Sequence, residues 1–152
     1  QVDDGAFGKA MEFDGNGDYV DCGNDNTFNI QANITVGAWV KYLDWNDGTA
    51  GMVVGKSNGG GKDEYLFYKM HDSTFRFLVY HGADFGNSYA GVDVSALNSA
   101  SFHFFVGTYD GRTIKLYLNG VLVGSKDYIG MIGGDSSAKV FIGAVKQLAK
   151  AE

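Results

Sequence analysis

Short runs in which apolar and polar residues alternate recur along this chain of 152 residues, and most of them begin and end at glycine, asparagine or aspartate. Alternation with a period of two puts every second side chain on one face of a strand, so each run predicts a half-buried β-strand between turns. In the run 34–42 (ITVGAWVKY), one face carries Ile34, Val36, Ala38 and Val40. Trp39 lies on the other face of this regular strand, and we expect its ring to pack in the core.

Further alternating runs predict strands at 9–13, 19–20, 52–56, 64–70, 74–80, 101–109, 113–118, 121–126 and 139–143. Asn119-Gly120 is the strongest hairpin signal, because a type I′ turn needs positive φ at both central positions. Turns at 71–73 and 110–111 predict two more hairpins, and 81–89 reads as a long loop. About ten strands at this spacing predict an all-β fold, an antiparallel two-sheet jelly-roll β-sandwich.

Composition narrows the class of protein. The length predicts one domain over 1–152. The formal net charge of −6 argues against a nucleic-acid partner, which needs a basic surface, and against docking on anionic lipid. No apolar run approaches the roughly 18 residues of a membrane span, so we expect no membrane insertion. Cys22 is the single cysteine, which excludes an intrachain disulfide. The start at Gln1 predicts a processed protein or a domain cut from a longer one.

Several segments together resemble one known family. They are 11–23 (MEFDGNGDYVDCG), 34–41 (ITVGAWVK), 102–125 (FHFFVGTYDGRTIKLYLNGVLVGS) and 141–143 (FIG). In these segments the chain resembles the laminin G-like (LamG) domains of the concanavalin A-like jelly-roll family, in their carbohydrate-binding and adhesion form. The resemblance implies a two-sheet sandwich, secreted or on a cell surface. It also implies glycan as a partner, and calcium in some members.

The resemblance fails at the C-terminal end. Family members usually continue past the Phe-Ile-Gly strand into a further strand of the type IDEVRIYNR, whereas this chain has the helix-prone sequence AVKQLAKAE over 144–152. We expect 144–152 to be a non-strand tail. Either the chain is truncated before the closing strand, or a partner chain or a second copy supplies that strand, or the tail itself packs over the open edge.

The turn 14–18 (DGNGD) carries the candidate metal ligands. Asp14, Asn16 and Asp18 alternate with glycines, which suits the convergence of carboxylate and amide oxygens on Ca²⁺. No glutamate closes an EF-hand loop. The alternative is a plain turn in which these side chains bond their own backbone.

Two segments carry candidate sugar-binding residues. Asp44, Trp45, Asn46 and Asp47 combine a ring that can stack on a pyranose with groups that bond hydroxyls. The alternative places Trp45 against the edge of the sandwich. In the loop 81–89 the candidates are His81, Asp84 and Tyr89, next to Tyr80.

Catalysis is not expected. Glycosidases need two carboxylates across one cleft, and sandwich-type glycosidases usually carry them in an E-x-D-x-E run, which this sequence lacks. The leading hypothesis is a non-catalytic, lectin-like carbohydrate-binding domain outside the cell. The alternative is a structural or adhesive subunit of an extracellular or viral assembly, completed by a partner's strand.

Overall fold

The computed structural model describes residues 1–58, 63–80, 88–133 and 137–143. These residues form strands and one short 3-10 helix, η1 (Asn26–Phe28). The strands are β1 (Val2–Gly5), β2 (Gly8–Ala10), β3 (Val20–Gly23), β4 (Ile34–Val40), β5 (Gly51–Ser57), β6 (Tyr65–Lys69), β7 (Thr74–Val79), β8 (Tyr89–Asp93), β9 (His103–Tyr109), β10 (Thr113–Leu118), β11 (Val121–Asp127) and β12 (Lys139–Ile142).

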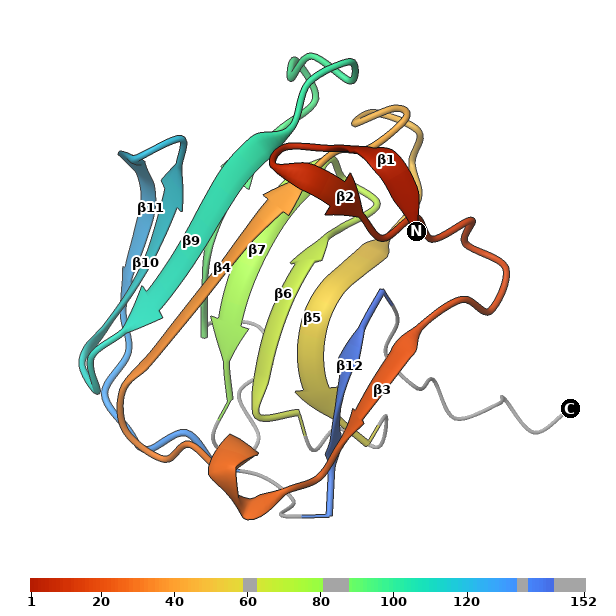
Figure 1. The fold of residues 1–152 in the computed structure, drawn as a ribbon. Helices are drawn as coiled ribbons and strands as arrows, with labels where there is room; N and C mark the ends of the chain where they lie inside the picture. The colour runs from red at the N-terminus through yellow and green to blue at the C-terminus, as the bar shows by residue number, and fades with distance from the viewer. Residues whose placement is uncertain (59–62, 81–87, 134–136, 144–152) are drawn as a thin grey trace, which may run out of the picture.

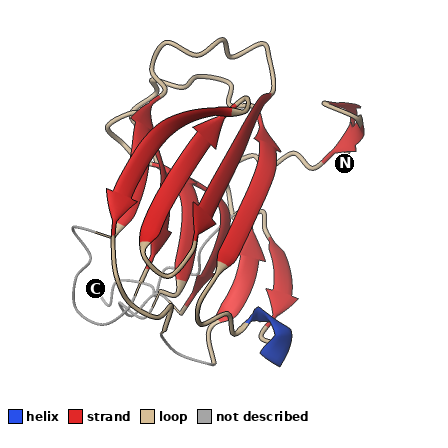
Figure 2. Ribbon diagram, turned by 90° about the vertical axis from the view of Figure 1, so that its left-hand side faces the viewer, coloured by secondary structure: helices blue, strands red, loops and turns tan. Residues whose placement is uncertain are grey.

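Two antiparallel sheets face each other (Figure 1). One has four strands in the order β11-β10-β9-β4, and the other has six in the order β3-β12-β5-β6-β7-β8. The hairpin β1–β2 stands apart as a separate two-stranded sheet, to one side of the sandwich (Figure 2). The predicted all-β, two-sheet architecture is confirmed. None of the described helical structure has the length and apolar character of a membrane span.

The predicted hairpins form as expected. Asn119 and Gly120 have φ of 51° and 85°, so both central residues of the β10–β11 turn adopt the positive φ that a type I′ turn requires. The turn 71–73 joins β6 to β7, whose residues pair in antiparallel register from Tyr65 opposite Val79. Ser73 takes a φ of 57° in this turn. Local turn chemistry therefore sets the pairing next to each turn, and in β10–β11 a bulge between Leu116 and Tyr117 then shifts the register by one residue.

Aromatic rings from the two sheets meet in the core. Phe75 of β7 stacks on Phe105 of β9, with ring centroids 3.9 Å apart, and Phe67 of β6 meets Phe75 edge-on at 4.8 Å. Gly107 of β9 faces Phe77: a Cβ at this position would lie 2.3 Å from the ring. The sheets approach so closely because this glycine leaves room for an aromatic ring of the opposite sheet.

The strands β6 and β7 are apolar on both faces. Tyr65, Phe67, Phe75, Phe77 and Val79 belong to the main core between the sheets. The side chains between them point the other way, and a second buried cluster forms from Leu66, Leu78 and Tyr80 on the outer face of the six-stranded sheet. A strand exposed on one side normally alternates apolar with polar residues. This hairpin instead carries packed side chains on both sides.

Trp39 corrects the expectation of a core position. It is 44% exposed, on the outer face of the four-stranded sheet, where it stacks on Phe104 at 5.0 Å and meets the ring of Phe7 edge-on at 5.4 Å. Alternation placed Trp39 on the face opposite Val40 correctly. The error was to treat that face as buried, because the outer face holds its own aromatic cluster.

Several strands differ in position or length from the expected ones. The predicted strand 9–13 ends at Ala10 and pairs with β1, which was not predicted. Strand β8 begins at Tyr89, a residue assigned to the end of a loop. The tail 144–152 lies outside the described residues.

The two sides of the sandwich differ. Where β8 approaches β11, the backbones come close: a Cβ on Gly124 would lie 2.7 Å from the carbonyl oxygen of Gly91. On the opposite side, β4 pairs with β9 and has no second strand neighbour among the described residues. The structure is therefore closed on its β8–β11 side and has an open sheet edge at β4.

The contact of Gly107 with Phe77 predicts an unequal response to alanine. Gly107→Ala should lower the free energy of unfolding by about 1–3 kcal/mol, since the new methyl group overlaps a fully buried ring. Gly37→Ala is the matched control on the neighbouring strand, because its Cβ would meet Phe104 at an ordinary 3.5 Å. Urea unfolding of both variants checks the prediction, and equal losses would contradict it.

Candidate functional site

The loop between β4 and β5 corrects the sugar-stacking hypothesis for Trp45. This side chain is 1% exposed, and its ring lies 4.8 Å from that of Tyr42 and 5.8 Å from that of Phe105. His103 meets it edge-on at 5.6 Å. Burying so large an aromatic surface closes one end of the core, so the alternative interpretation holds and the ring is not available to a sugar.

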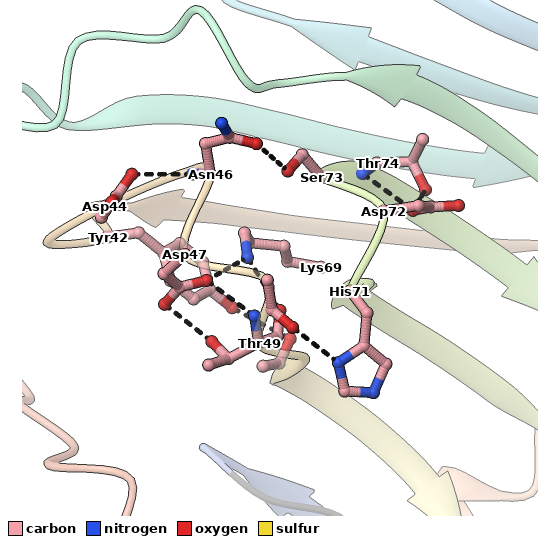
Figure 3. Close-up of polar contacts among 12 residues, drawn as sticks. Tyr42, Asp44, Asn46, Asp47, Thr49, Lys69, His71, Asp72, Ser73 and Thr74 are labelled. Carbon is pink, nitrogen blue, oxygen red and sulfur yellow. Dashed lines mark hydrogen bonds and ion pairs between the residues drawn. The ribbon is translucent and has the colours of Figure 1, made fainter.

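A buried lysine holds the polar part of this loop in place (Figure 3). Lys69, at the end of β6, donates from Nζ to Asp47 Oδ1 at 2.7 Å and to the carbonyl oxygen of Thr49 at 2.8 Å. Its side chain is fully buried, whereas a third of the Asp47 side chain is exposed. The hydrogen bond from Lys69 is the main cause that lowers the pKa of Asp47 to about 2. The carboxylate is therefore ionised at neutral pH and serves as an anchor for the loop.

The β6–β7 turn supplies a second anchor. Ser73 Oγ donates to Asn46 Oδ1 at 2.8 Å, and His71 Nδ1 lies 2.9 Å from the carbonyl oxygen of Gly48. Asp44 Oδ1 accepts the backbone N–H of Asn46 at 2.8 Å. The three polar candidates Asp44, Asn46 and Asp47 are exposed, yet each also fixes the loop. Their contact with a ligand stays a prediction.

The predicted calcium turn has the geometry of an Asx turn. Asp14 Oδ1 accepts the backbone N–H of Asn16 at 2.7 Å, and Asp18 Oδ2 accepts that of Asp14 at 3.4 Å. Two carboxylates and one amide fall short of the six to eight oxygens that Ca²⁺ takes, so backbone carbonyls and water would have to supply the rest. No three acidic, histidine or cysteine side chains converge as a metal site in the described part of the chain. Calcium binding stays a prediction.

The second predicted sugar-binding segment is described only at its end. His81 and Asp84 lie outside the described residues. Tyr89 lies in β8, and its ring stacks against the guanidinium of Arg76, with Cζ 4.5 Å from the ring centroid. Gly91, two residues on, lets this pair form: a Cβ there would meet both Arg76 and Tyr89 at 3.3 Å.

Arg76 is the centre of a polar cluster that the sequence analysis missed. We call Tyr68, Asp72, Arg76 and Tyr89 the tyrosine–arginine patch; it lies on the outer face of the six-stranded sheet. Arg76 Nη2 donates to Asp72 Oδ2 at 2.5 Å, and Nε donates to Thr74 Oγ1 at 2.8 Å. Tyr68 pairs with Arg76 across the ladder of β6 and β7. The patch therefore brings together residues from three adjacent strands and one turn.

The protonation states of the patch follow from these contacts. Burial raises the pKa of Tyr68, against the opposing effect of the Arg76 guanidinium. Hydrogen bonding from the Thr74 hydroxyl is the first cause that lowers the pKa of Asp72, and Arg76 adds to it. At neutral pH the patch thus offers a carboxylate, a guanidinium and a neutral phenol. Such a set can donate to and accept from hydroxyl groups beside an aromatic ring.

One signal could have found this patch in the sequence. The runs YLFYK and TFRFLVY are largely apolar on both faces; Lys69 ends the first run, and Arg76 is the single cation inside the second run. A lone arginine in a strand that is otherwise apolar needs local partners, because a half-buried charge is costly without them. Three of these partners lie nearby in the chain, at Tyr68, Asp72 and Thr74.

The anchor on Asp47 predicts a specific acid response. The folded-state pKa of about 2 lies below the roughly 3.9 of an unfolded aspartate, so this stabilisation is complete above about pH 4 and is lost as the pH falls towards 2. Lys69→Met should raise the pKa of Asp47 towards its ordinary value and cost about 1 kcal/mol, a small loss because water screens the exposed carboxylate.

Carboxyl NMR titration and urea unfolding across the acid range measure both effects. Lys41→Met is the control, because Lys41 pairs with the largely exposed Asp4 at 2.8 Å and should contribute little. A wild-type Asp47 that titrates near 4 would contradict the prediction.

The comparisons with known proteins agree with this architecture. The sequence profile of the concanavalin A-like lectin/glucanases superfamily, in its laminin G form, matches residues 14–150. No curated protein is a significant match. Among solved structures, domains LG4–5 of the mouse laminin α1 chain are 16% identical with a TM-score of 0.56, over 81% of this chain and 30% of that chain.

Two other solved structures share the fold. One is the carbohydrate-binding module CBM40 of a Ruminococcus gnavus sialidase, bound to α2,3-sialyllactose: 17% identity, a TM-score of 0.53, 78% of this chain and 66% of that one. The other is the HCR/D W1238A mutant: 16% identity, a TM-score of 0.60, 88% and 33%. The chain thus spans about a third of the laminin and HCR/D chains. The profile match and the shared sandwich show that this chain belongs to the concanavalin A-like lectin/glucanases superfamily.

Proposed function

We propose that this chain is a non-catalytic carbohydrate-binding module that acts outside the cell and binds glycan at the tyrosine–arginine patch. The observation that carries the proposal is the placement of Arg76 between Asp72 and Tyr89, on the outer face of a sheet. Asn46 borders the patch, because its Oδ1 accepts a hydrogen bond from Ser73, the neighbour of Asp72. A sugar bound at the patch would reach Asn46, and contacts with Asp44 and Asp47 stay predictions.

Sugar recognition needs a rigid arrangement of a flat apolar surface and hydrogen-bonding groups. Tyr68 and Tyr89 supply partly buried rings, and both pack against the buried cluster of Leu66, Leu78 and Tyr80. Asp72 and Arg76 supply an acceptor and donors. The fold supports this proposal, since the CBM40 module that shares it binds sialyllactose.

The absence of catalysis is part of the proposal. The sequence has no E-x-D-x-E run of the kind that carries paired glycosidase carboxylates, and its three glutamates are scattered at Glu12, Glu64 and Glu152. The extracellular location is proposed by likeness to a laminin domain and a carbohydrate-binding module.

Removing a ring from the patch should abolish most binding. Tyr89→Ala should weaken the affinity for a glycan identified on an array by about tenfold or more, because it removes an aromatic face and the support of Arg76. Tyr117→Ala is the control, since this half-buried tyrosine lies on the outer face of the other sheet. Titration calorimetry of both variants checks the prediction.

Equal affinities for the two variants would contradict the proposed site, and silence across the array would contradict the proposed function. A second array with EDTA tests the calcium prediction. Binding lost on chelation and also lost in Asp18→Asn would support a metal at the turn 14–18, and unchanged binding would make that turn purely structural.

One observation favours a second candidate function, a structural subunit. Strand β4 is an edge strand of seven residues, its ladder with β9 has no bulge, and it contains neither charge nor proline. Natural edge strands normally carry a bulge, a charged side chain or a proline, which prevents pairing with another chain. We therefore propose, as the alternative, that a strand from a second copy can complete the four-stranded sheet at β4.

A charge on the β4 edge tests this alternative. We expect the wild type to self-associate across micromolar concentrations and Thr35→Lys to prevent this, since a lysine at an edge opposes strand addition. Thr108→Lys is the control, because it places the same charge opposite Thr35 on the interior strand β9. Sedimentation velocity gives the answer, and a wild type that stays monomeric throughout would rule the alternative out.

A further inference from the structure

Arg76 lies at the bottom of the tyrosine–arginine patch, and its positive charge is already balanced by the carboxylate of Asp72. Its side chain is 15% exposed, whereas that of its partner Asp72 is 54% exposed. Anything that approaches the patch from solvent therefore meets the carboxylate as well as the guanidinium. The lowered pKa of Asp72 keeps that carboxylate ionised at neutral pH.

A second cation on this face is also balanced by a carboxylate: Lys139 of β12 is paired with Asp21 at 2.7 Å. The whole chain has a formal net charge of −6. A carboxylated or sulfated sugar would meet repulsion from Asp72, and the charge of Arg76 that would attract it is already balanced by that carboxylate.

A neutral sugar meets no charge repulsion at the patch, and it finds open hydrogen-bonding positions there. Asp72 Oδ1 accepts two hydrogen bonds from Thr74, at 3.1 Å from the backbone N–H and 2.5 Å from the hydroxyl, and Oδ2 accepts one from Arg76. A carboxylate has about four acceptor directions, so one stays open, and the guanidinium has more N–H donors than these partners use. Two adjacent hydroxyls on a sugar present a donor and an acceptor side by side, as the paired Asp72 carboxylate and Arg76 guanidinium present an acceptor and a donor.

We propose that the patch selects a neutral saccharide, held by a vicinal diol with one hydroxyl donating to Asp72 and its neighbour accepting from Arg76, and that it discriminates against acidic sugars. The inference rests on the proposed function and deepens it. The aromatic face of Tyr68, beside Arg76 on the next strand, is placed to pack on the sugar ring. Discrimination comes from the exposed carboxylate, and affinity comes from the diol and the ring.

The test compares matched pairs of oligosaccharides by calorimetry with the whole chain. Lactose is compared with 3′-sialyllactose, and neutral galactan and glucan oligomers are compared with their sulfated or uronic-acid counterparts. We expect the neutral member of each pair that binds to be tighter by about fivefold or more, with little change between low and high salt, because no net charge is neutralised.

Asp72→Asn separates the roles of the two groups. It keeps an acceptor oxygen and removes the charge, so we expect the preference for neutral over acidic sugars to shrink at least severalfold. Asp110→Asn is the matched control, because Asp110 caps the β9–β10 turn through the backbone N–H groups of Arg112 and Thr113 on the other sheet. The control should leave the preference unchanged.

The outcomes are distinct. Tighter binding of the acidic member, with an affinity that falls as salt rises, would overturn this inference and leave the proposed function standing. A preference that Asp72→Asn leaves unchanged would also overturn it. Failure of every sugar, neutral and acidic, would overturn the proposed function and this inference with it.

Discussion

The stack of Phe75 on Phe105 is the contact on which the rest of the structure depends. It joins β7 of the six-stranded sheet to the interior strand β9 of the four-stranded sheet, and Gly107 allows the sheets to approach so closely. Because the β6–β7 hairpin is fixed from the core side, its outer side becomes a rigid support. The same two strands that fill the core therefore hold Tyr68 and Arg76 in fixed positions, and rigidity in the core is passed directly to the patch.

The sheets and hairpins could be predicted from the sequence because their signals are local. Alternation in the run 34–42 assigns faces correctly, and the Asn119-Gly120 turn determines its own register through backbone conformation. Strand β8 was missed because Tyr89 to Asp93 contains Gly91, which weakens the strand pattern. A Cβ at Gly91 would come within 3.3 Å of both Arg76 and Tyr89, a tight contact between strands that one segment alone cannot reveal.

The two tryptophans show where local reasoning about sites ends. Trp39 lies in a regular strand and is half-exposed, whereas Trp45 lies in a polar loop and is buried. The regular strand predicted a core position for Trp39, whereas the polar loop left Trp45 open between sugar stacking and packing on the sandwich. The fate of Trp45 depends on the space between Phe105 and His103, and on the anchoring of its loop by Lys69 from another strand. Burial of a loop residue is thus decided by partners distant in the sequence. Because Trp45 is buried, the proposed sugar-binding site lies instead at the tyrosine–arginine patch, on the outer face of the six-stranded sheet.

The close backbone approach of Gly124 to Gly91 holds the two sheets together on the β8–β11 side, whereas the opposite side ends in the open edge of β4. On the β8–β11 side, a side chain at position 124 would push the two sheets apart, so we expect substitutions there to be poorly tolerated. At the β4 edge, substitutions on the outer side alter little of the interior. What pairs with β4 can therefore change without disturbing the β8–β11 side or the tyrosine–arginine patch beside it.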